Sequence, residues 1–181
     1  MTGVQTCALP IFIELAAQIE RIARFTDLKK GITVNPGIVR GGTRTNVIAA
    51  HAEVDVDVRV MKIKDATALD KRFRSLKPHN RKCRIEVSGG VNRPPMERSE
   101  KVLRLYHLAE QLARGLGYKT KEKGTGGGSD GNFTAALGVP TLDGLGAVGE
   151  GAHAIHESIV LAELPRRTAL LAGLIAYAER K

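Results

Sequence analysis

The stretch Ala52-Glu-Val-Asp-Val-Asp-Val-Arg-Val60 carries the clearest secondary-structure signal of the chain. Valine occupies every second position from Val54 on, and aspartate or arginine occupies the positions between. Side chains of a β-strand point alternately to its two faces, so this alternation predicts a strand with one buried face and one solvated face. The strand therefore belongs to a sheet that packs against helices on one side only.

The segments around this strand predict an α+β layer. They are, in order, a helix over 12–25, a strand over 32–39, a turn at Gly41-Gly42, the strand within 46–61, a helix capped by Asp65 and running to Leu76, and a strand over 83–87. Apolar residues recur with helical spacing in the helices and at every second position in the strands. This order predicts an antiparallel sheet with two helices on one face, a ferredoxin-like layer that lacks its first strand. The absent strand would lie directly before Phe12.

After Arg93-Pro94-Pro95 the pattern changes to helices that alternate with short apolar segments. The predicted elements are a helix from Ser99 to Gly115 or Gly117, a strand over 118–123, a glycine-rich loop and helix to Leu137, a strand over 139–142, and a helix from Pro165 to Tyr177. The alternation is typical of an α/β domain, and this part is too small to cover both faces of such a sheet. The sequence thus predicts two parts, 12–92 and 93–181.

Composition argues against several classes of protein. A hydrophobic content of 43% is ordinary for a globular domain, and no apolar run reaches the roughly 18 residues that span a bilayer. Aromatic residues make up 4% with no tryptophan, which argues against stacking platforms for nucleic acid. The net charge is +9, but the charges interleave along the predicted helices, as on a solvated face. We therefore expect neither nucleic acid nor a membrane as a partner.

The cysteine content indicates a cellular compartment, and the first eleven residues indicate where the gene-encoded sequence begins. Cys7 and Cys83 make no disulfide framework, and Cys83 is predicted to be a small core residue, so the cytoplasm is favoured. Residues 2–11, Thr-Gly-Val-Gln-Thr-Cys-Ala-Leu-Pro-Ile, resemble the translation of a short-read sequencing adaptor. They lack the basic start and the longer apolar core of a secretory signal. We expect residues 1–11 to be non-native and the gene-encoded sequence to begin near Phe12.

Two glycine-rich segments of the second part contain candidate functional residues. Gly149-Glu-Gly-Ala-His153-Ala-Ile-His156-Glu157 places a histidine on a glycine-bounded loop, with a carboxylate four positions on. Zinc draws its ligands from such side chains, so His153 is a candidate ligand, and a surface-loop histidine is the alternative. Gly126-Gly-Gly-Ser-Asp130 precedes a predicted helix, where backbone N–H groups form either an anion seat or a plain capped loop.

Five segments together carry a family resemblance. They are Arg40-Gly-Gly-Thr-Arg-Thr-Asn46, Asp55-Val-Asp-Val-Arg59, Gly90-Val-Asn-Arg-Pro-Pro95, Gly126-Gly-Gly-Ser-Asp130 and Gly151-Ala-His153. In this order they resemble the zinc exopeptidase family of glutamate carboxypeptidases, aminoacylases, acetylornithine deacetylase and succinyl-diaminopimelate desuccinylase. The glutamate carboxypeptidase branch is the most similar. The resemblance implies that 12–92 is most of a lid or dimerisation domain, and that 93–181 is the C-terminal portion of an α/β catalytic domain.

The resemblance also implies a metal site, of which this chain carries one ligand. His153 matches the family's final zinc ligand, and the spacing to Glu157 selects it over His156; Glu157 is expected to orient the imidazole ring. The intact enzymes hold two zinc ions. Their HxD segment, bridging aspartate, Glu-Glu pair and lid histidine would all precede Phe12, so no catalytic acid or base is assigned in this chain.

The residues that match substrate-binding positions of the family are Asn46, Arg59, Arg93, Gly127 and Gly128. Arginine offers a fixed fork of donors to a carboxylate or an oxyanion, and asparagine offers an amide to the peptide group. The glycines offer backbone N–H groups to a carboxylate or to a tetrahedral intermediate. A turn residue for Asn46 and a solvent-face ion pair for Arg59 are the alternatives.

The function implied for the parent protein is zinc-dependent hydrolysis of an amide bond next to a free carboxylate. The substrate would be a small peptide with a C-terminal amino acid, or an N-acyl amino acid, and the lid would form a homodimer. With one zinc ligand and no general base, the chain is expected to be inactive by itself. The alternative is a non-catalytic dimerisation or binding module, in which 12–92 pairs edge to edge with a second copy.

Overall fold

The computed structural model describes residues 11–179, so residues 1–10 of the adaptor-like segment lie outside the described part. The chain divides into two compact units, one ending at Pro95 and one beginning at Met96, and each is described by itself. Both helices and strands are present, as the predicted mixed α/β and α+β class requires. Within residues 11–179, no helix combines the length and the apolar character needed to cross a membrane.

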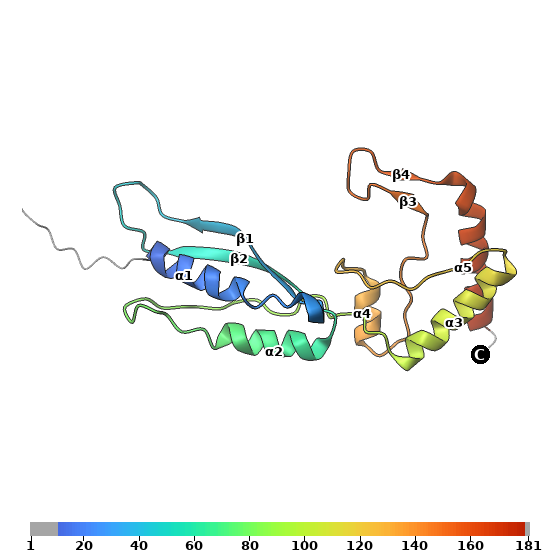
Figure 1. Ribbon diagram of the computed structural model, residues 1–181, viewed down its shortest axis with the longest axis horizontal. Coiled ribbons are helices and arrows are strands. Elements are labelled where there is room, and N and C mark those ends of the chain that lie inside the picture. Colours follow the sequence, from blue (N-terminus) through green and yellow to red (C-terminus); the bar gives the residue numbers. More distant parts are fainter. Residues whose placement is uncertain (1–10, 180–181) are drawn as a thin grey trace, which may run out of the picture. The chain divides into compact units, whose positions relative to one another are not determined.

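A two-stranded antiparallel ribbon forms the frame of the first unit (Figure 1). Strand β1 (Thr33–Gly41) pairs with strand β2 (Ala52–Arg59), in which Val54 and Val56 pack onto the core, the carboxylates between them are exposed, and Val58 is 38% exposed. The register shifts between Pro36 and Ile38, where the proline has no N–H to donate. The predicted strand with one dry face is therefore confirmed.

Helices α1 (Ile11–Ala23) and α2 (Ile63–Arg74) supply the rest of this unit, and α1 lies along both strands of the ribbon (Figure 1). A 3-10 turn, η1 (Leu28–Lys30), lies between α1 and β1. The buried core residues are Ile22, Phe25, Ile32, Val34 and Leu69. Phe25 also meets Phe73 of α2 edge to face, with the ring centroids 5.4 Å apart. Both predicted helices are thus present; α2 buries its expected apolar face, whereas the buried residues of α1 are Glu14, Gln18 and Ile22.

Two predictions for this unit are wrong. The cap of α2 is Lys62, and Asp65 lies instead in the first turn, where a carboxylate still interacts favourably with the helix dipole. Residues 83–87 alternate between the core and solvent as predicted, but they form no strand pairing within the described chain. A strand needs the N–H and C=O groups of a neighbouring strand, and no other segment of residues 11–179 pairs with 83–87.

The second unit is organised by helices α3 (Glu100–Gly115) and α5 (Leu164–Ala178), which pack together through Ala109, Ala113 and Leu170. The predicted cap of α3 is confirmed, because the Ser99 hydroxyl oxygen accepts a hydrogen bond from the Val102 N–H at 3.3 Å. Small side chains on α3 let the two helices approach closely. This pairing is the hydrophobic centre of the unit.

Short elements complete the second unit: α4 (Gly131–Ala136), β3 (Gly149–Glu150), β4 (Ser158–Ile159) and η2 (Leu161–Glu163). The strands predicted over 118–123 and 139–142 are wrong, since neither segment has a strand partner among residues 11–179. A side-chain ion pair holds the segment 118–123 in place instead. The Arg98 guanidinium holds the Glu122 carboxylate at 2.8 and 2.9 Å, and this pairing lowers the pKa of Glu122.

Replacing Leu170 with alanine is expected to destabilise the second unit by about 3 kcal/mol, because the side chain is 1% exposed and its removal leaves a cavity beside Ala109 and Ala113. The three tyrosines of the sequence all lie in this unit, so their fluorescence during urea unfolding measures its stability. Leu171→Ala, at a neighbouring position that is 44% exposed, is the control and should cost far less. Equal losses for the two variants would contradict the assigned core.

Candidate functional site

The predicted metal ligand, His153, lies on the loop that joins β3 to β4. The two strands pair antiparallel, with Gly149 opposite Ile159. They approach so closely that a Cβ on Gly149 would lie 2.0 Å from the Ser158 carbonyl oxygen, a distance that only glycine avoids. Figure 1 shows this hairpin as a loop that extends away from α4, and His153 is exposed on it. The sequence did not predict the two strands that support the histidine.

The backbone of His153 is in the left-handed region, with φ +68°. Among residues 11–179 it is the only residue other than glycine with a positive φ. Such a conformation costs an L-residue with a Cβ on the order of 1–2 kcal/mol, and strained residues of this kind gather at functional sites. The strain therefore supports a functional reading of His153 over that of an ordinary surface histidine.

The contacts of Glu157 and His156, the neighbours of His153, differ from those expected from the sequence. A Glu157 carboxylate oxygen accepts a hydrogen bond from the His153 backbone N–H at 3.4 Å, so Glu157 contacts the backbone rather than the imidazole. The ring of His156 packs over Gly151, where a Cβ would lie 2.8 Å from the ring carbon Cδ2. His156 thus takes part in loop packing, and His153 remains the candidate ligand.

The glycine-rich loop before α4 is held by its own side chains. The Gly127 N–H donates to the Thr125 hydroxyl at 3.2 Å, and the Ser129 N–H donates to the Asn132 side-chain carbonyl at 2.8 Å. The Gly131 N–H donates to the Ser129 hydroxyl at 3.1 Å. The Gly127 N–H is therefore hydrogen-bonded within the loop, whereas an anion-binding site would need this N–H to point at a ligand. Gly128 is exposed in the same loop.

Asn132, the second residue of α4, is buried beside this loop, with 9% of its surface exposed. Asn132→Ala removes the acceptor for the Ser129 N–H, and the loop should then open more often. Exchange of the Ser129 amide proton, followed by NMR, is expected to become about tenfold faster, as for one lost hydrogen bond of roughly 1.4 kcal/mol. Asn132→Asp keeps the acceptor and should leave the exchange rate close to that of the wild type. Unchanged exchange in the alanine variant would show that the loop does not depend on Asn132.

Asn46 and Arg59 lie far apart in the first unit. Asn46 lies in a turn closed by the Val47 N–H and the Arg44 carbonyl at 3.2 Å, in the loop beyond one end of the ribbon. Arg59 ends β2 at the opposite end of the ribbon, and the Ala52–Arg59 strand spans roughly 23 Å at about 3.3 Å per residue. The two side chains therefore do not meet at one group of a small substrate within one chain.

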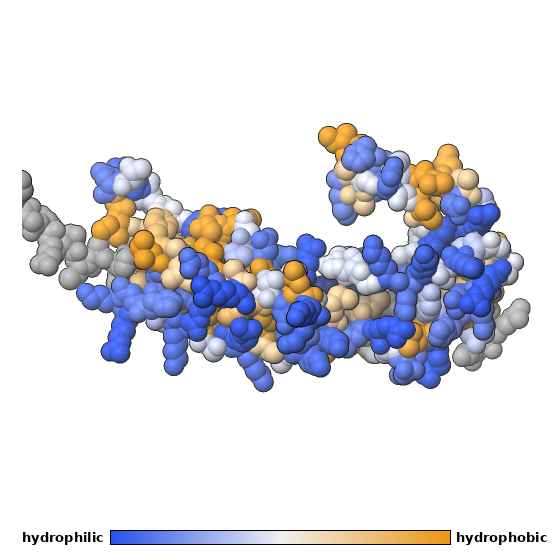
Figure 2. Space-filling model, viewed as in Figure 1, coloured by the Kyte–Doolittle hydropathy of each residue, from blue (hydrophilic) through white to orange (hydrophobic). Residues whose placement is uncertain are grey.

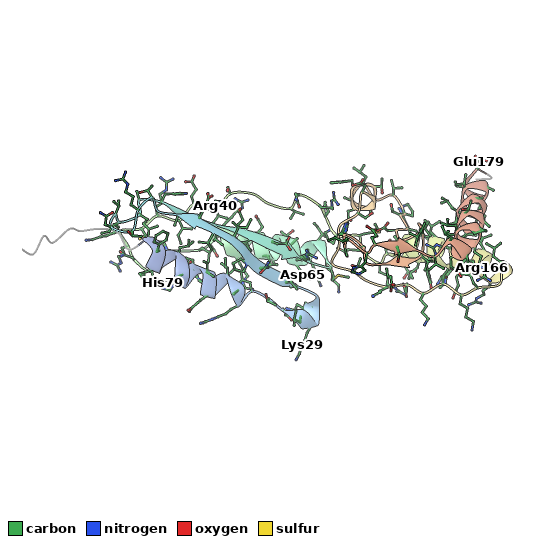
Figure 3. All side chains as sticks on the ribbon, turned by 90° about the horizontal axis from the view of Figure 1, so that it is seen from above. Lys29, Arg40, Asp65, His79, Arg166 and Glu179 are labelled. Atoms are coloured by element: carbon green, nitrogen blue, oxygen red, sulfur yellow. The ribbon has the colours of Figure 1, made fainter. Side chains whose placement is uncertain are left out.

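The exposed carboxylates of β2 are paired with arginines. Arg40, labelled on the ribbon in Figure 3, donates to Asp55 at 2.8 Å and to Glu53 at 3.1 Å, and these bonds raise the pKa of Arg40. Arg59 donates to Asp57 at 2.8 Å, which is the solvent-face ion pair that the sequence left as an alternative. Arginine partners of this kind occupy the oxygens that a metal ion would need.

The described residues do not by themselves build a zinc site. Zinc needs three or four protein ligands, and no three His, Cys, Asp or Glu side chains gather between residues 11 and 179 in a way that could hold an ion. His153 is one ligand, on an exposed loop. Arg93 is exposed in the loop before Pro94 and belongs to the first unit, whereas His153 and the glycine loop belong to the second.

Three buried polar residues, Glu14, Gln18 and Asn132, were not predicted from the sequence. Glu14 and Gln18 are 7% and 6% exposed on the inner face of α1, where they align with Ile22 at intervals of four residues. Polar residues on an otherwise apolar helical stripe are the signal that could have found them. For Asn132, the spacing of three residues from Ser129 at a helix start is the corresponding signal.

Comparisons with known proteins agree with the fold and the motifs. Residues 12–177 match the model of a family described as Peptidase family M20/M25/M40. The chain is 28% identical over 169 residues to Carboxypeptidase G2 of Pseudomonas sp. (strain RS-16), a match that covers 90% of this chain and 40% of the relative. The chain therefore spans about two fifths of the length of this curated relative.

A solved structure shares the fold. Aminopeptidase PepT from Bacillus cereus ATCC 10987 superposes with a TM-score of 0.65 at 24% sequence identity, over 88% of this chain and 44% of the other. The predicted resemblance to the zinc exopeptidase family and its glutamate carboxypeptidase branch is confirmed by these matches. The chain belongs to the peptidase family M20/M25/M40.

Proposed function

We propose that this chain is part of a zinc-dependent metallopeptidase or amidohydrolase that cleaves an amide bond next to a free carboxylate. The substrate would be a small peptide with a C-terminal amino acid, or an N-acyl amino acid. The single observation that carries the proposal is the strained His153 on a glycine-bounded hairpin, in a chain that belongs to a peptidase family. An exposed imidazole can ligate an ion that other segments complete.

In the proposed enzyme, positively charged and amide side chains of this chain hold the substrate. Arg93 and Arg59 offer guanidinium groups to the substrate carboxylate, and Asn46 offers its amide to the peptide group. Gly127 and Gly128 would contribute backbone N–H groups once Gly127 exchanges its hydrogen bond to Thr125 for one to substrate. Because Asn46 and Arg59 lie at opposite ends of the ribbon, they would contact separate parts of the bound complex.

The same proposal includes an organisation of the parent protein. Residues 12–92 would form the lid that makes a homodimer, and 93–181 would complete a catalytic domain in the cytoplasm. Figure 2 shows apolar surface over the hairpin and the start of α5. The exposed apolar residues of this region are Ile155, Ile159, Val160 and Leu161. Apolar patches mark surfaces that other parts of a protein cover, which supports a contact there with further chain.

One comparison tests the proposed function. Hydrolysis of N-acyl amino acids and of peptides with C-terminal glutamate would be measured with added zinc. Two proteins would be compared: this chain, and an extended version in which the gene-encoded sequence upstream of Phe12 replaces residues 1–11. We expect activity in the extended version alone, since one candidate ligand does not hold zinc in place. Activity in the chain by itself would overturn its expected inactivity. Activity in neither protein would favour a non-catalytic dimerisation or binding module.

A further inference from the structure

The hairpin around His153 contains two successive turns. The Ala154 N–H donates to the Gly151 carbonyl at 2.8 Å, and the Glu157 N–H donates to the Ala154 carbonyl at 3.0 Å. His153 occupies the third position of the first turn. Of the two central residues of this turn only His153 has a positive φ, which is the pattern of a type II turn, in which the third residue is normally glycine. The hairpin therefore keeps a histidine at a position where glycine would be favoured.

Other contacts fix the hairpin on both sides of this turn. Gly149 leaves no space for a Cβ between the strands, and Gly151, with φ +71°, makes room for the ring of His156. The Val160 N–H donates to the Val148 carbonyl at 2.8 Å, which closes the base of the hairpin. None of these contacts touches His153. One hydrogen bond joins His153 to the second turn: the His153 N–H donates to the Glu157 carboxylate.

We propose that Glu157 is a positioning residue that keeps His153 in its left-handed backbone conformation, and so presents the imidazole on the hairpin loop. The carboxylate accepts the N–H of the strained residue and joins the end of the second turn to the middle of the first. Holding the backbone in this way is a different role from orienting the imidazole ring. The inference rests on the proposed function only in taking the imidazole as a zinc ligand.

The test follows the His153 amide by NMR in the full chain and in three variants. Glu157→Ala removes the acceptor, and exchange of the His153 amide proton is expected to become about tenfold faster, with a changed coupling between the amide and α protons. Glu157→Gln retains a side-chain oxygen and should restore most of the protection. Glu150→Ala, at another exposed glutamate of the same hairpin, should leave His153 unchanged. The Val160 amide serves as the reference for the hairpin as a whole.

Two outcomes would overturn the proposal. One is equal exchange of the His153 amide in the wild type and in Glu157→Ala. The other is an equal rise at Val160 in that variant, because Glu157 would then stabilise the entire hairpin rather than position one residue.

A second readout separates this proposal from the proposed function. In the version extended upstream of Phe12, Glu157→Ala should lower kcat/KM for the N-acyl substrates about tenfold, and Glu157→Gln should restore it, as for partners that orient a ligand. If the extended version hydrolyses nothing while the amide exchange behaves as expected, the positioning role stands and the proposed function fails. Hydrolysis that is insensitive to Glu157→Ala, with unchanged amide exchange, rejects the positioning role and leaves the proposed function standing.

Discussion

Replacing His153 with alanine is expected to lower kcat/KM of the extended protein by at least about 100-fold, beyond the 10–100-fold typical of losing an outer partner of a metal ligand. The imidazole is the candidate zinc ligand, no cluster of three possible ligands exists among residues 11–179, and alanine offers no donor in its place. Hydrolysis of an N-acyl amino acid would be followed with and without added zinc. The alanine variant should need more zinc to recover any activity, because a site with fewer ligands binds the ion more weakly.

His107→Ala is the matched control for this variant. His107 is an exposed histidine of the same unit, its side chain being 61% exposed, and it contacts Glu110 on α3 at 3.6 Å. Its loss should leave kcat/KM and the zinc dependence unchanged. Full activity of the His153→Ala protein would remove His153 from the metal site and would return it to the surface-loop interpretation.

Glu14→Gln is expected to destabilise the first unit by about 3 kcal/mol, the upper range for hydrogen bonds to a charged group. The Glu14 carboxylate accepts the backbone N–H groups of His79 and Asn80 at 3.1 and 2.9 Å, and the side-chain amide of Gln18 at 2.7 Å. It thereby joins α1 to the turn that follows α2. Figure 3 labels His79 in this turn. Glutamine keeps one acceptor oxygen but places an NH2 group where a buried N–H needs an acceptor.

The same variant should change how stability depends on pH. Burial alone would raise the pKa of Glu14, but the hydrogen bonds from Asn80, Gln18 and His79 outweigh it and hold that pKa below the ordinary value of 4.5. A carboxyl with a lowered folded-state pKa contributes its full stability above the unfolded value, and that stability is lost as the pH falls through the folded-state pKa. The wild type should therefore lose stability in acid below about pH 4.5, and Glu14→Gln should lose less.

The measurement is hydrogen exchange of the ladder amides of β1 and β2, whose protection reports on the stability of the first unit. Glu20→Gln is the control on the same helix: the Glu20 side chain is 77% exposed and lies 3.9 Å from Arg24. An exposed pair of this kind is worth at most about 1 kcal/mol, so this variant should behave almost as the wild type. Equal effects at Glu14 and Glu20 would contradict the assigned role of the buried carboxylate.

Local sequence patterns were sufficient for the elements whose signal lies within the element itself. Alternating valines predicted β2, helical spacing predicted α1 to α3 and α5, and Ser99 marked the start of α3, since each signal depends on side chains a few residues apart. The family, too, could be recognised from five short motifs, and residues 12–177 confirm it. The roles of Asn46, Arg59, Arg93, Gly127 and Gly128 remain predictions.

Strand pairing could not be predicted in the same way. Residues 83–87, 118–123 and 139–142 have apolar patterns suited to strands, yet within the described chain they find no partner. Conversely, β3 and β4 are too short to carry a pattern, and they exist because Gly149 lets two backbones approach. A ladder depends on which edge lies alongside, and that is a property of the folded chain rather than of the segment.

The sequence by itself determined the family, the strand β2, the longer helices and His153 as the candidate ligand, because motifs and periodicity are local. Tertiary structure alone decided the contacts between residues distant in the chain or held by backbone geometry. It gave Glu14 its partners 65 and 66 residues away, separated Asn46 from Arg59 along β2, and held His153 at a positive φ beside Glu157. Burial, hydrogen-bond acceptance and backbone strain arise only when the chain has folded around these groups.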